Sequence, residues 1–192
     1  MNPMIWISDA EPGHCTLDSS YVPYTSEMHA GESVAAKFPR DIKYQMSDLF
    51  PDDLLLSDNF ECAGQIVVSL PLKERLAKEL LGHHLEFLPV TILNHKGRIA
   101  STDYFIVHSQ DMVDCINIAK SKVQWNPLDK AIIMACKGLV INDAAIPEGV
   151  RLFRPVHWGS MTMVDSRLAE NLQSAGFTGL CFISAAGFDG IS

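Results

Sequence analysis

Residues 150–182, VRLFRPVHWGSMTMVDSRLAENLQSAGFTGLCF, contain the pattern that decides the fold. A short extended run ends at Pro155, and a second apolar run, residues 161–164, stops at Asp165. Asp165 or Ser166 can begin a helix, because either side-chain oxygen can accept a hydrogen bond from the free N–H groups of the first turn. The stretch therefore predicts a strand, a second strand, a helix and a third strand, in that order.

The predicted helix carries Leu168 and Leu172 one turn apart, so both side chains lie on one face and can be buried against a sheet. Gly176 ends the helix, because glycine adopts the left-handed conformation that often follows a helix at little cost. Residues 180–183 form a third apolar run. This order indicates an α+β domain.

The same order of elements occurs once more upstream. Residues 65–68 are an apolar run, Ser69 can cap a helix, and Pro71 suits the first helical turn, where its missing N–H is not needed. The predicted apolar face of this helix consists of Leu72, Leu76, Leu80 and Leu81. Gly82 ends the helix. Either an internal duplication or the general likeness of strand–helix–strand units explains the repetition.

Residues 85–108 are predicted to form a β-hairpin. The first strand, residues 85–93, contains Pro89, which favours a sheet edge or a bulge because proline cannot donate a ladder hydrogen bond. Gly97 allows positive φ in the turn that follows. We expect one α+β domain over residues 1–192, with a mixed or largely antiparallel sheet and packed helices.

The remaining parts of the chain have weaker patterns. Residues 1–45 are the least regular, with a short apolar run at 5–7 and a candidate helix within 27–38. Residues 130–136, KAIIMAC, fit a helix or a strand. The tail, residues 184–192, is rich in small residues and is predicted to be flexible.

Composition limits the class of protein. The 192 residues are 47% apolar, which is enough for a sizeable core without disulfides. No window approaches ~20 consecutive apolar residues, and the N-terminus lacks the basic start and apolar core of a signal peptide. We therefore expect no membrane association and a cytoplasmic location. The odd number and wide spacing of the cysteines indicate reduced, mostly buried thiols: Cys15, Cys62, Cys115, Cys136 and Cys181.

The formal net charge of −8 argues against nucleic-acid binding and suits a basic protein partner. Residues 46–64, MSDLFPDDLLLSDNFECAG, contain no Lys or Arg. Their acids are Asp48, Asp52, Asp53, Asp58 and Glu61, with large apolar residues between them. The segment is either a short element buried by its leucines, with a solvated acidic rim, or an acidic docking surface. We predict that these five acids contribute to partner binding.

No catalytic motif and no metal-ligand spacing is present in the sequence, so we expect no catalytic residue, no cofactor and no bound metal. His14 and Cys15 could form a thiol–base pair, although a buried cysteine is the simpler interpretation. Arg154 could bind an anion beside His157, or it could satisfy strand-end carbonyls while Trp158 packs in the core.

His83 and His84 follow the end of the upstream helix. Imidazoles near a helix C-terminus interact favourably with the helix dipole. We prefer this interpretation to a metal site, because adjacent residues point in different directions.

Four stretches together resemble one protein family. They are LEFLPVTILNHKGRI (85–99), YFIVHSQDMVDCIN (104–117), GLVINDAAIPEGVRLFR (138–154) and MTMVDSRLAENLQSAGFTGLCF (161–182). Their order and spacing over residues 46–183 resemble immunity family eleven, one of the immunity-protein families of bacterial polymorphic toxin systems, earlier catalogued as a domain of unknown function. Asn117 stands where the family pattern has an Asp.

The resemblance implies a protein that binds a cognate secreted toxin domain in the cytoplasm and neutralises it by occluding its active or substrate-binding site. Such a protein needs no catalytic residue, and a toxin that acts on nucleic acid would be basic. The alternatives are an enzyme of unrecognised type and a non-enzymatic chaperone or adaptor for a secreted effector. An adjacent gene for a large secreted protein with a toxic C-terminal domain would favour the immunity function.

Overall fold

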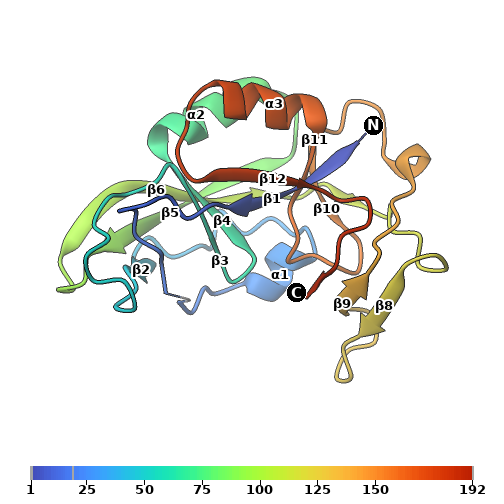
Figure 1. Ribbon diagram of the computed structural model, residues 1–192, viewed down its shortest axis with the longest axis horizontal. Coiled ribbons are helices and arrows are strands. Elements are labelled where there is room, and N and C mark those ends of the chain that lie inside the picture. Colours follow the sequence, from blue (N-terminus) through green and yellow to red (C-terminus); the bar gives the residue numbers. More distant parts are fainter. Residues whose placement is uncertain (1, 19, 192) are drawn as a thin grey trace.

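The computed structural model describes residues 2–18 and 20–191, and most of their regular structure is sheet (Figure 1). The first of two five-stranded sheets has the order β12 (Leu180–Ser184), β1 (Pro3–Ser8), β11 (Met163–Asp165), β10 (Leu152–Pro155) and β7 (Met112–Val113). The second has the order β2 (Lys43–Gln45), β5 (Leu85–Leu93), β6 (Ile99–Ser109), β4 (Gln65–Ser69) and β3 (Asn59–Cys62). A small third sheet contains β13 (Gly190–Ile191), β9 (Ile133–Lys137) and β8 (Lys122–Trp125).

The described residues also form three α-helices, α1 (Thr25–His29), α2 (Leu70–Glu79) and α3 (Ser166–Ser174), and one 3₁₀ turn, Asp143–Ala145. Only the β2–β5 and β7–β10 pairs are parallel among the paired strands, so both large sheets are mixed. The fold is therefore an α+β fold dominated by its sheets. None of the helices in the described residues is long and apolar enough to cross a membrane.

The two large sheets contain the same four-stranded unit. In the second sheet, β3 pairs with β4, α2 follows β4, and β5 lies beyond an intervening antiparallel strand, β6. In the first sheet, β10 pairs with β11, α3 follows β11, and β12 lies beyond β1. The units differ in the origin of the middle strand, because β6 follows β5 directly whereas β1 comes from the start of the chain. The repeated sequence pattern thus corresponds to a repeated topology.

Helices α2 and α3 begin where the sequence predicts. The Ser69 hydroxyl accepts a hydrogen bond from the Leu72 N–H at 3.4 Å, and the Asp165 carboxylate accepts one from the Leu168 N–H at 2.6 Å. These caps satisfy first-turn donors that have no partner within the helix. The predicted apolar face of α2 is wrong at Leu81, which is 84% exposed because the helix has already ended at its C-cap, Leu80.

The two helices lie along the same side of the large sheets (Figure 1). Leu72 and Leu76 of α2 and Leu168 and Leu172 of α3 are completely buried. They belong to one apolar cluster that also contains side chains of both sheets, among them Trp6 of β1. Packing of both helices over both sheets joins the two units.

Two further apolar clusters lie elsewhere in the molecule. One contains side chains of the second sheet and of the N-terminal segments, such as Met28 and Tyr44. The other contains side chains of the first sheet and of the small third sheet, such as Phe153 and Ile133. Residues 5–7, the short apolar run of the N-terminal part, form part of β1 between β12 and β11.

The predicted hairpin is formed by β5 and β6. The Asn94 N–H donates to the Arg98 carbonyl at 2.8 Å, and Gly97 has φ +68°. Pro89 lies in the part of β5 that has a ladder partner only in β6, because β2 pairs with residues 91–93, and the register shifts after Val90. Pro89 therefore lies where the sequence predicts: β5 is paired on one side only at this position, and a register shift follows.

The structure tests three predictions for the less regular parts. The helix within residues 27–38 is only the single turn α1, whereas the strand alternative for residues 130–136 is confirmed by β9. The prediction of a flexible tail is wrong for the described residues, because β13 pairs with β9 and Ala185 is completely buried. Phe188 also lies 6.2 Å from Trp158 between ring centroids. The last residue, Ser192, lies outside the described residues.

Candidate functional site

The segment between β2 and β3, residues 47–58, is here called the acidic loop. It exposes four large apolar side chains: Leu49 (81%), Phe50 (51%), Leu54 (62%) and Leu55 (57%). Of the apolar residues predicted to bury this segment, only Leu56 and Phe60 pack against the core. A group of exposed apolar side chains on one loop is typical of an interaction surface.

Three of the five predicted acids belong to this exposed part of the acidic loop. Asp48 is 80% exposed at its side chain and lies 3.4 Å from Nδ1 of His95. Asp52 is exposed and Asp53 is half-buried. The His95 ring, in the β5–β6 turn, also lies 3.2 Å from the Asp53 carbonyl oxygen through Nε2. The hairpin turn therefore supports the acidic loop from one side.

Asp58 is engaged inside the fold. One carboxylate oxygen accepts a hydrogen bond from the Ser69 hydroxyl at 2.6 Å, and the other accepts from the N–H and hydroxyl of Thr178, both at 3.1 Å. Asp58 thus connects the start of α2 to the segment that precedes β12. Its carboxylate holds the two repeated units together.

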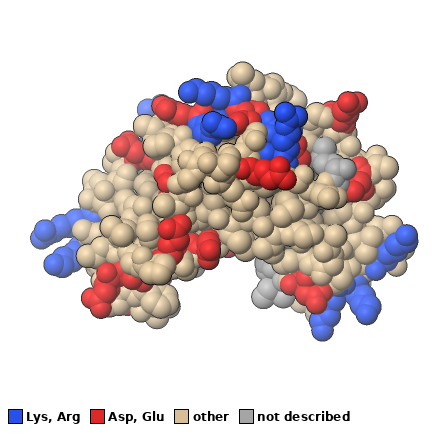
Figure 2. Space-filling model, turned by 45° about the horizontal axis from the view of Figure 1, so that its top comes forward, with Lys and Arg blue, Asp and Glu red and all other residues tan. Residues whose placement is uncertain are grey.

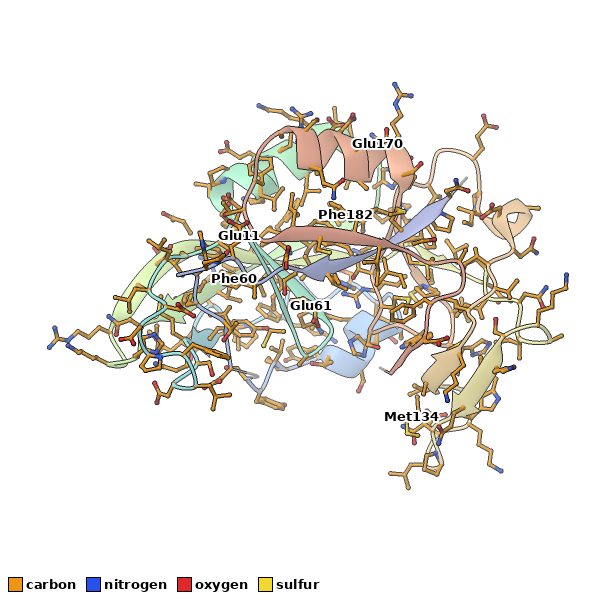
Figure 3. The ribbon with its side chains drawn as sticks, viewed as in Figure 1. Glu11, Phe60, Glu61, Met134, Glu170 and Phe182 are labelled. Atoms are coloured by element: carbon orange, nitrogen blue, oxygen red, sulfur yellow. The ribbon has the colours of Figure 1, made fainter. Side chains whose placement is uncertain are left out.

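Glu61 lies on β3, away from the exposed leucines in sequence. Its carboxylate accepts a hydrogen bond from the Gly64 N–H at 2.9 Å in the tight β3–β4 turn, and the side chain is exposed. Figure 3 shows Glu61 and Phe60 on this hairpin near the middle of the molecule. The five acids therefore occupy three separate places: the exposed part of the acidic loop, its last residue Asp58, which is bonded inside the fold, and the β3–β4 hairpin.

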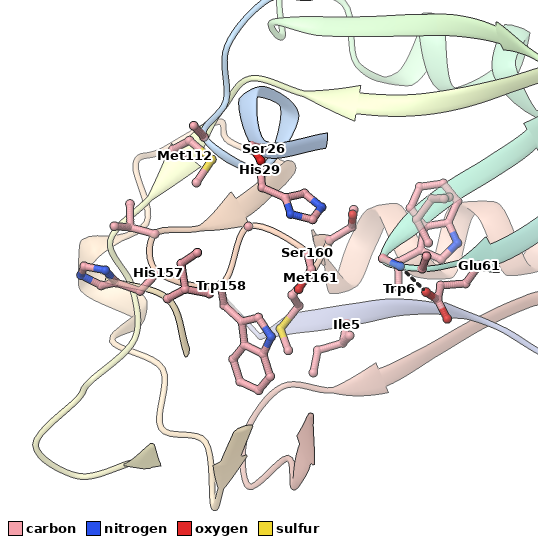
Figure 4. Close-up of a pocket in the computed structure, with 18 of the residues that line it drawn as sticks. Ile5, Trp6, Ser26, His29, Glu61, Met112, His157, Trp158, Ser160 and Met161 are labelled. Atoms are coloured by element: carbon pink, nitrogen blue, oxygen red, sulfur yellow. Dashed lines mark hydrogen bonds between the residues drawn. The ribbon is translucent and has the colours of Figure 1, made fainter. Parts of the chain in front are cut away.

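Glu61 also lines a cavity of about 1130 Å³. Segments of β1, α1, the β3–β4 hairpin, the loop before β9 and residues 156–162 surround it, together with Met112 and Phe188 (Figure 4). Trp158 and Met161 are buried in its apolar wall, whereas Glu61 and Asp129 are exposed. No Lys or Arg of the described residues lines it. Figure 2 shows the surface hollowed between two lobes at the bottom of the view.

Close backbone contacts fix the cavity wall. A Cβ atom on Gly159 would lie 2.0 Å from the His29 carbonyl oxygen, and one on Gly64 would lie 2.9 Å from the Ser160 Cβ. Segments far apart in the chain therefore touch at positions where only glycine fits. The cavity is preformed, because it is present in the chain without a partner, and these contacts connect parts of its wall.

Backbone strain is concentrated in the same segments. The non-glycine residues with positive φ in the described chain are Tyr24, Ala63 and His157. Ala63 and His157 line the cavity, and Tyr24 immediately precedes α1, which supplies Ser26 and His29 to it. Strained residues of this kind persist when the surroundings hold them, and they cluster at functional sites.

A buried guanidinium lies behind the cavity wall. Arg154 is completely buried, and its Nη1 atom donates a hydrogen bond to the Gly159 carbonyl. Its Nε and Nη2 atoms have no hydrogen-bond partner in the described part of the chain, and burial lowers its pKa to about 10. Trp158 is 1% exposed. The interpretation of an arginine bonded to a carbonyl beside a core tryptophan is confirmed.

The pKa of His29 is lowered to about 4, chiefly by burial and further by the charge of Arg154. The pKa of His108 is also lowered, because burial outweighs its hydrogen bond to the Glu32 carbonyl. At neutral pH both imidazoles are therefore uncharged. This arrangement avoids further positive charge beside a buried arginine.

Acid is expected to destabilise the fold through His29. The unfolded imidazole titrates near 6.5, so between pH 6.5 and 4 the unfolded state binds more protons and stability falls as pH decreases. From the pKa of about 4, we expect His29 to contribute about 1–2 kcal/mol to the loss between pH 7 and pH 5. Urea unfolding of the parent and of His29→Gln at both pH values measures the contribution of His29 to this loss of stability. Equal losses in the two proteins would contradict it.

The remaining catalytic candidates are not activated in the structure. Cys15 is 4% exposed, and burial raises the pKa of its thiol to about 11. A reactive thiol needs the opposite shift. The other cysteines are also free thiols, and the pKa of each is raised by burial. His157 instead directs Nδ1 to the Ala131 carbonyl oxygen at 2.8 Å.

His83 and His84 both contact one carboxylate, a contact that the sequence did not indicate. Each places Nδ1 3.2 Å from a different carboxylate oxygen of Asp111. The described residues contain no group of three or more His, Cys, Asp or Glu side chains that could hold a metal ion.

An exposed apolar surface beside carboxylates is typical of proteins that bind other proteins. The sequence of this chain matches the family model of the Imm11 immunity protein family over residues 17–187, and the chain belongs to this family. The match extends into the N-terminal part, whose sequence shows the weakest patterns. No curated protein matches the chain.

Proposed function

We propose that this chain binds a cognate toxin domain in the cytoplasm of the producing cell and neutralises it by occluding the toxin's active or substrate-binding site. Membership of an immunity protein family supports a toxin partner. The observation that carries a direct binding mechanism is the exposure of Leu49, Phe50, Leu54 and Leu55 on the acidic loop. Apolar side chains with charged neighbours have the composition of an interface centre and its rim.

Charge supports a basic toxin. The chain has a formal net charge of −8, and Asp48, Asp52 and Asp53 flank the exposed apolar residues. A basic partner would be attracted before contact, which raises the association rate. We propose that these three acids form the rim of the interface and that Asp58 contributes through the fold.

Inhibition by binding alone is favoured over an enzymatic mechanism. The pKa of the Cys15 thiol is raised to about 11 by burial, so the thiolate is scarce at neutral pH. Arg154 is completely buried and cannot meet a substrate at the surface. Both centres proposed for an alternative enzyme thus have environments that oppose catalysis.

Production of the purified toxin domain with and without this chain tests the proposal. We expect a stable complex, loss of the toxin's activity in the complex, and survival of cells that make both proteins. Formation of a complex that leaves the toxin active would instead support a chaperone or adaptor. Absence of any complex with the toxin encoded beside this gene would contradict the proposal.

Leu54→Ser is expected to weaken toxin binding about tenfold or more without lowering stability. Leu54 is 62% exposed, so truncation removes little buried area from the free protein but removes apolar contact from the complex. Leu81→Ser is the matched control, because Leu81 is 84% exposed at the end of α2. Calorimetric titration compares both variants with the parent, and equal weakening by both substitutions would contradict a role for the acidic loop.

A further inference from the structure

The cavity behind Glu61 has the features of a binding site that the acidic loop does not explain. Its volume of about 1130 Å³ is slightly above the usual range of ligand pockets, about 300–1,000 Å³. Trp158, Met161 and Met112 supply large apolar surfaces. In Figure 4 Trp158 and Met161 lie close together, with Glu61 and His157 on opposite sides of them. Such a surface favours an apolar group.

The charges around the cavity determine where a suitable occupant can carry a positive charge. Glu61 and Asp129 are exposed, so their carboxylates lie toward the mouth, and no described Lys or Arg lines the cavity. Arg154, whose Nη1 donates to the Gly159 carbonyl, lies behind the deep wall and would repel a cation there. A suitable occupant is therefore apolar in its deep part and positive at the mouth.

The buried wall also offers an unused hydrogen-bonding group. Thr162 lines the cavity and is 4% exposed, and its hydroxyl has no hydrogen-bond partner among the described residues. A buried polar group without a partner is uncommon and costs stability. A main-chain group of an inserted segment could satisfy it.

We propose that the cavity receives an apolar side chain from a loop of the toxin, and that a neighbouring Lys or Arg of the toxin pairs with Glu61 and Asp129 at the mouth. This inference rests on the proposed function and adds a second contact to the acidic loop. The cavity exists before the toxin arrives, and the glycine contacts at Gly159 and Gly64 connect the segments of its wall. A preformed pocket avoids the cost of ordering its walls during association.

Filling the cavity tests the inference. Ala131 is exposed and lines the cavity, so Ala131→Trp should place an indole in its mouth. We expect affinity for the purified toxin domain, measured by calorimetry, to fall at least 100-fold with the melting temperature unchanged. Ala77→Trp is the matched control, because Ala77 is exposed on α2 and does not line the cavity. Its affinity should stay within threefold of the parent.

Two more variants keep the test decisive if Ala131→Trp fails to fold. Ser26→Trp fills the cavity from α1, and Glu61→Lys reverses the charge of an exposed rim residue. We expect losses of affinity of at least 100-fold and tenfold respectively. Glu74→Lys, an exposed position on α2, is the control for the change in net charge and should have less than half the effect of Glu61→Lys on a logarithmic scale.

The outcomes separate this inference from the proposed function. If the parent does not bind the toxin, the proposed function is wrong and the inference falls with it. If the parent binds and the cavity variants bind equally well, the inference is overturned and the proposed function stands. If native mass spectrometry finds a small molecule that Ala131→Trp loses while toxin affinity is unchanged, the cavity is a small-molecule site and the inference is again overturned.

Discussion

Leu172→Ala is expected to lower the free energy of unfolding by about 2–5 kcal/mol. Leu172 is completely buried on α3, in the cluster that holds both helices against both large sheets. Truncation removes apolar contact and leaves a space that neighbours on two rigid sheets cannot fill. Because Leu76 of α2 belongs to the same cluster, the substitution weakens the connection between the two repeated units.

Urea denaturation at neutral pH, followed by circular dichroism, measures the loss. Gln173→Ala is the control, because Gln173 is exposed on the same helix and alanine is at least as good a helix former. The control should change stability by less than about 0.5 kcal/mol. A change of that small size for Leu172→Ala would show that α3 is not part of the core.

Reversing Asp52 and Asp53 to Lys is expected to slow association with a basic toxin about 10–100-fold at low salt. The two residues are adjacent on the acidic loop, and Asp52 is exposed beside Leu54. Two charges change sign at the rim of the proposed interface, which shifts the net charge by four units, so long-range attraction becomes repulsion. The dissociation rate should change less, because rim charges act mainly before contact.

Stopped-flow association at low and high salt is the measurement, with Glu74→Lys/Glu170→Lys as the matched control. These glutamates are exposed on α2 and α3, so the control changes net charge equally but elsewhere on the surface. The reversed acidic loop should show a weaker salt dependence than the parent, and its thermal stability should be nearly unchanged. Equal slowing by both double variants would mean that only net charge matters, and unchanged association at low salt would mean that the loop does not contact the toxin.

Local chemistry explains which parts of the fold were predictable from the sequence. Ser69 and Asp165 specify helix starts, and Gly97 specifies a turn, through contacts with residues a few positions away. Such signals depend only on residues that are close together in the sequence. Leu81 shows their limit, because the end of a helix one residue earlier turned a predicted core leucine into an 84% exposed one.

The candidate site was less predictable because it depends on distant segments. The acidic composition of residues 46–64 was visible, but the exposure of Leu54 and the internal bonding of Asp58 depend on what packs above them. The cavity combines seven separate stretches of the chain from Ile5 to Phe188, and of its lining only Glu61, His157 and Trp158 stand out in the sequence. Gly159 was a further indication of this part of the wall, because a glycine often marks a position where another segment of backbone approaches closely.

The position of β1 has a consequence for how the chain acquires its fold. β11 and β12 do not pair with each other; both pair with residues 3–8, which are synthesised long before them. The N-terminal unit of the repeat contains all its strands within residues 59–109, so it can assemble while synthesis continues. The other unit must wait until residues 163–184 emerge to meet a strand made more than a hundred residues earlier. Closure of that long loop is therefore the slow step that completes the molecule, and until then the apolar edge of β1 is open to association with other nascent chains.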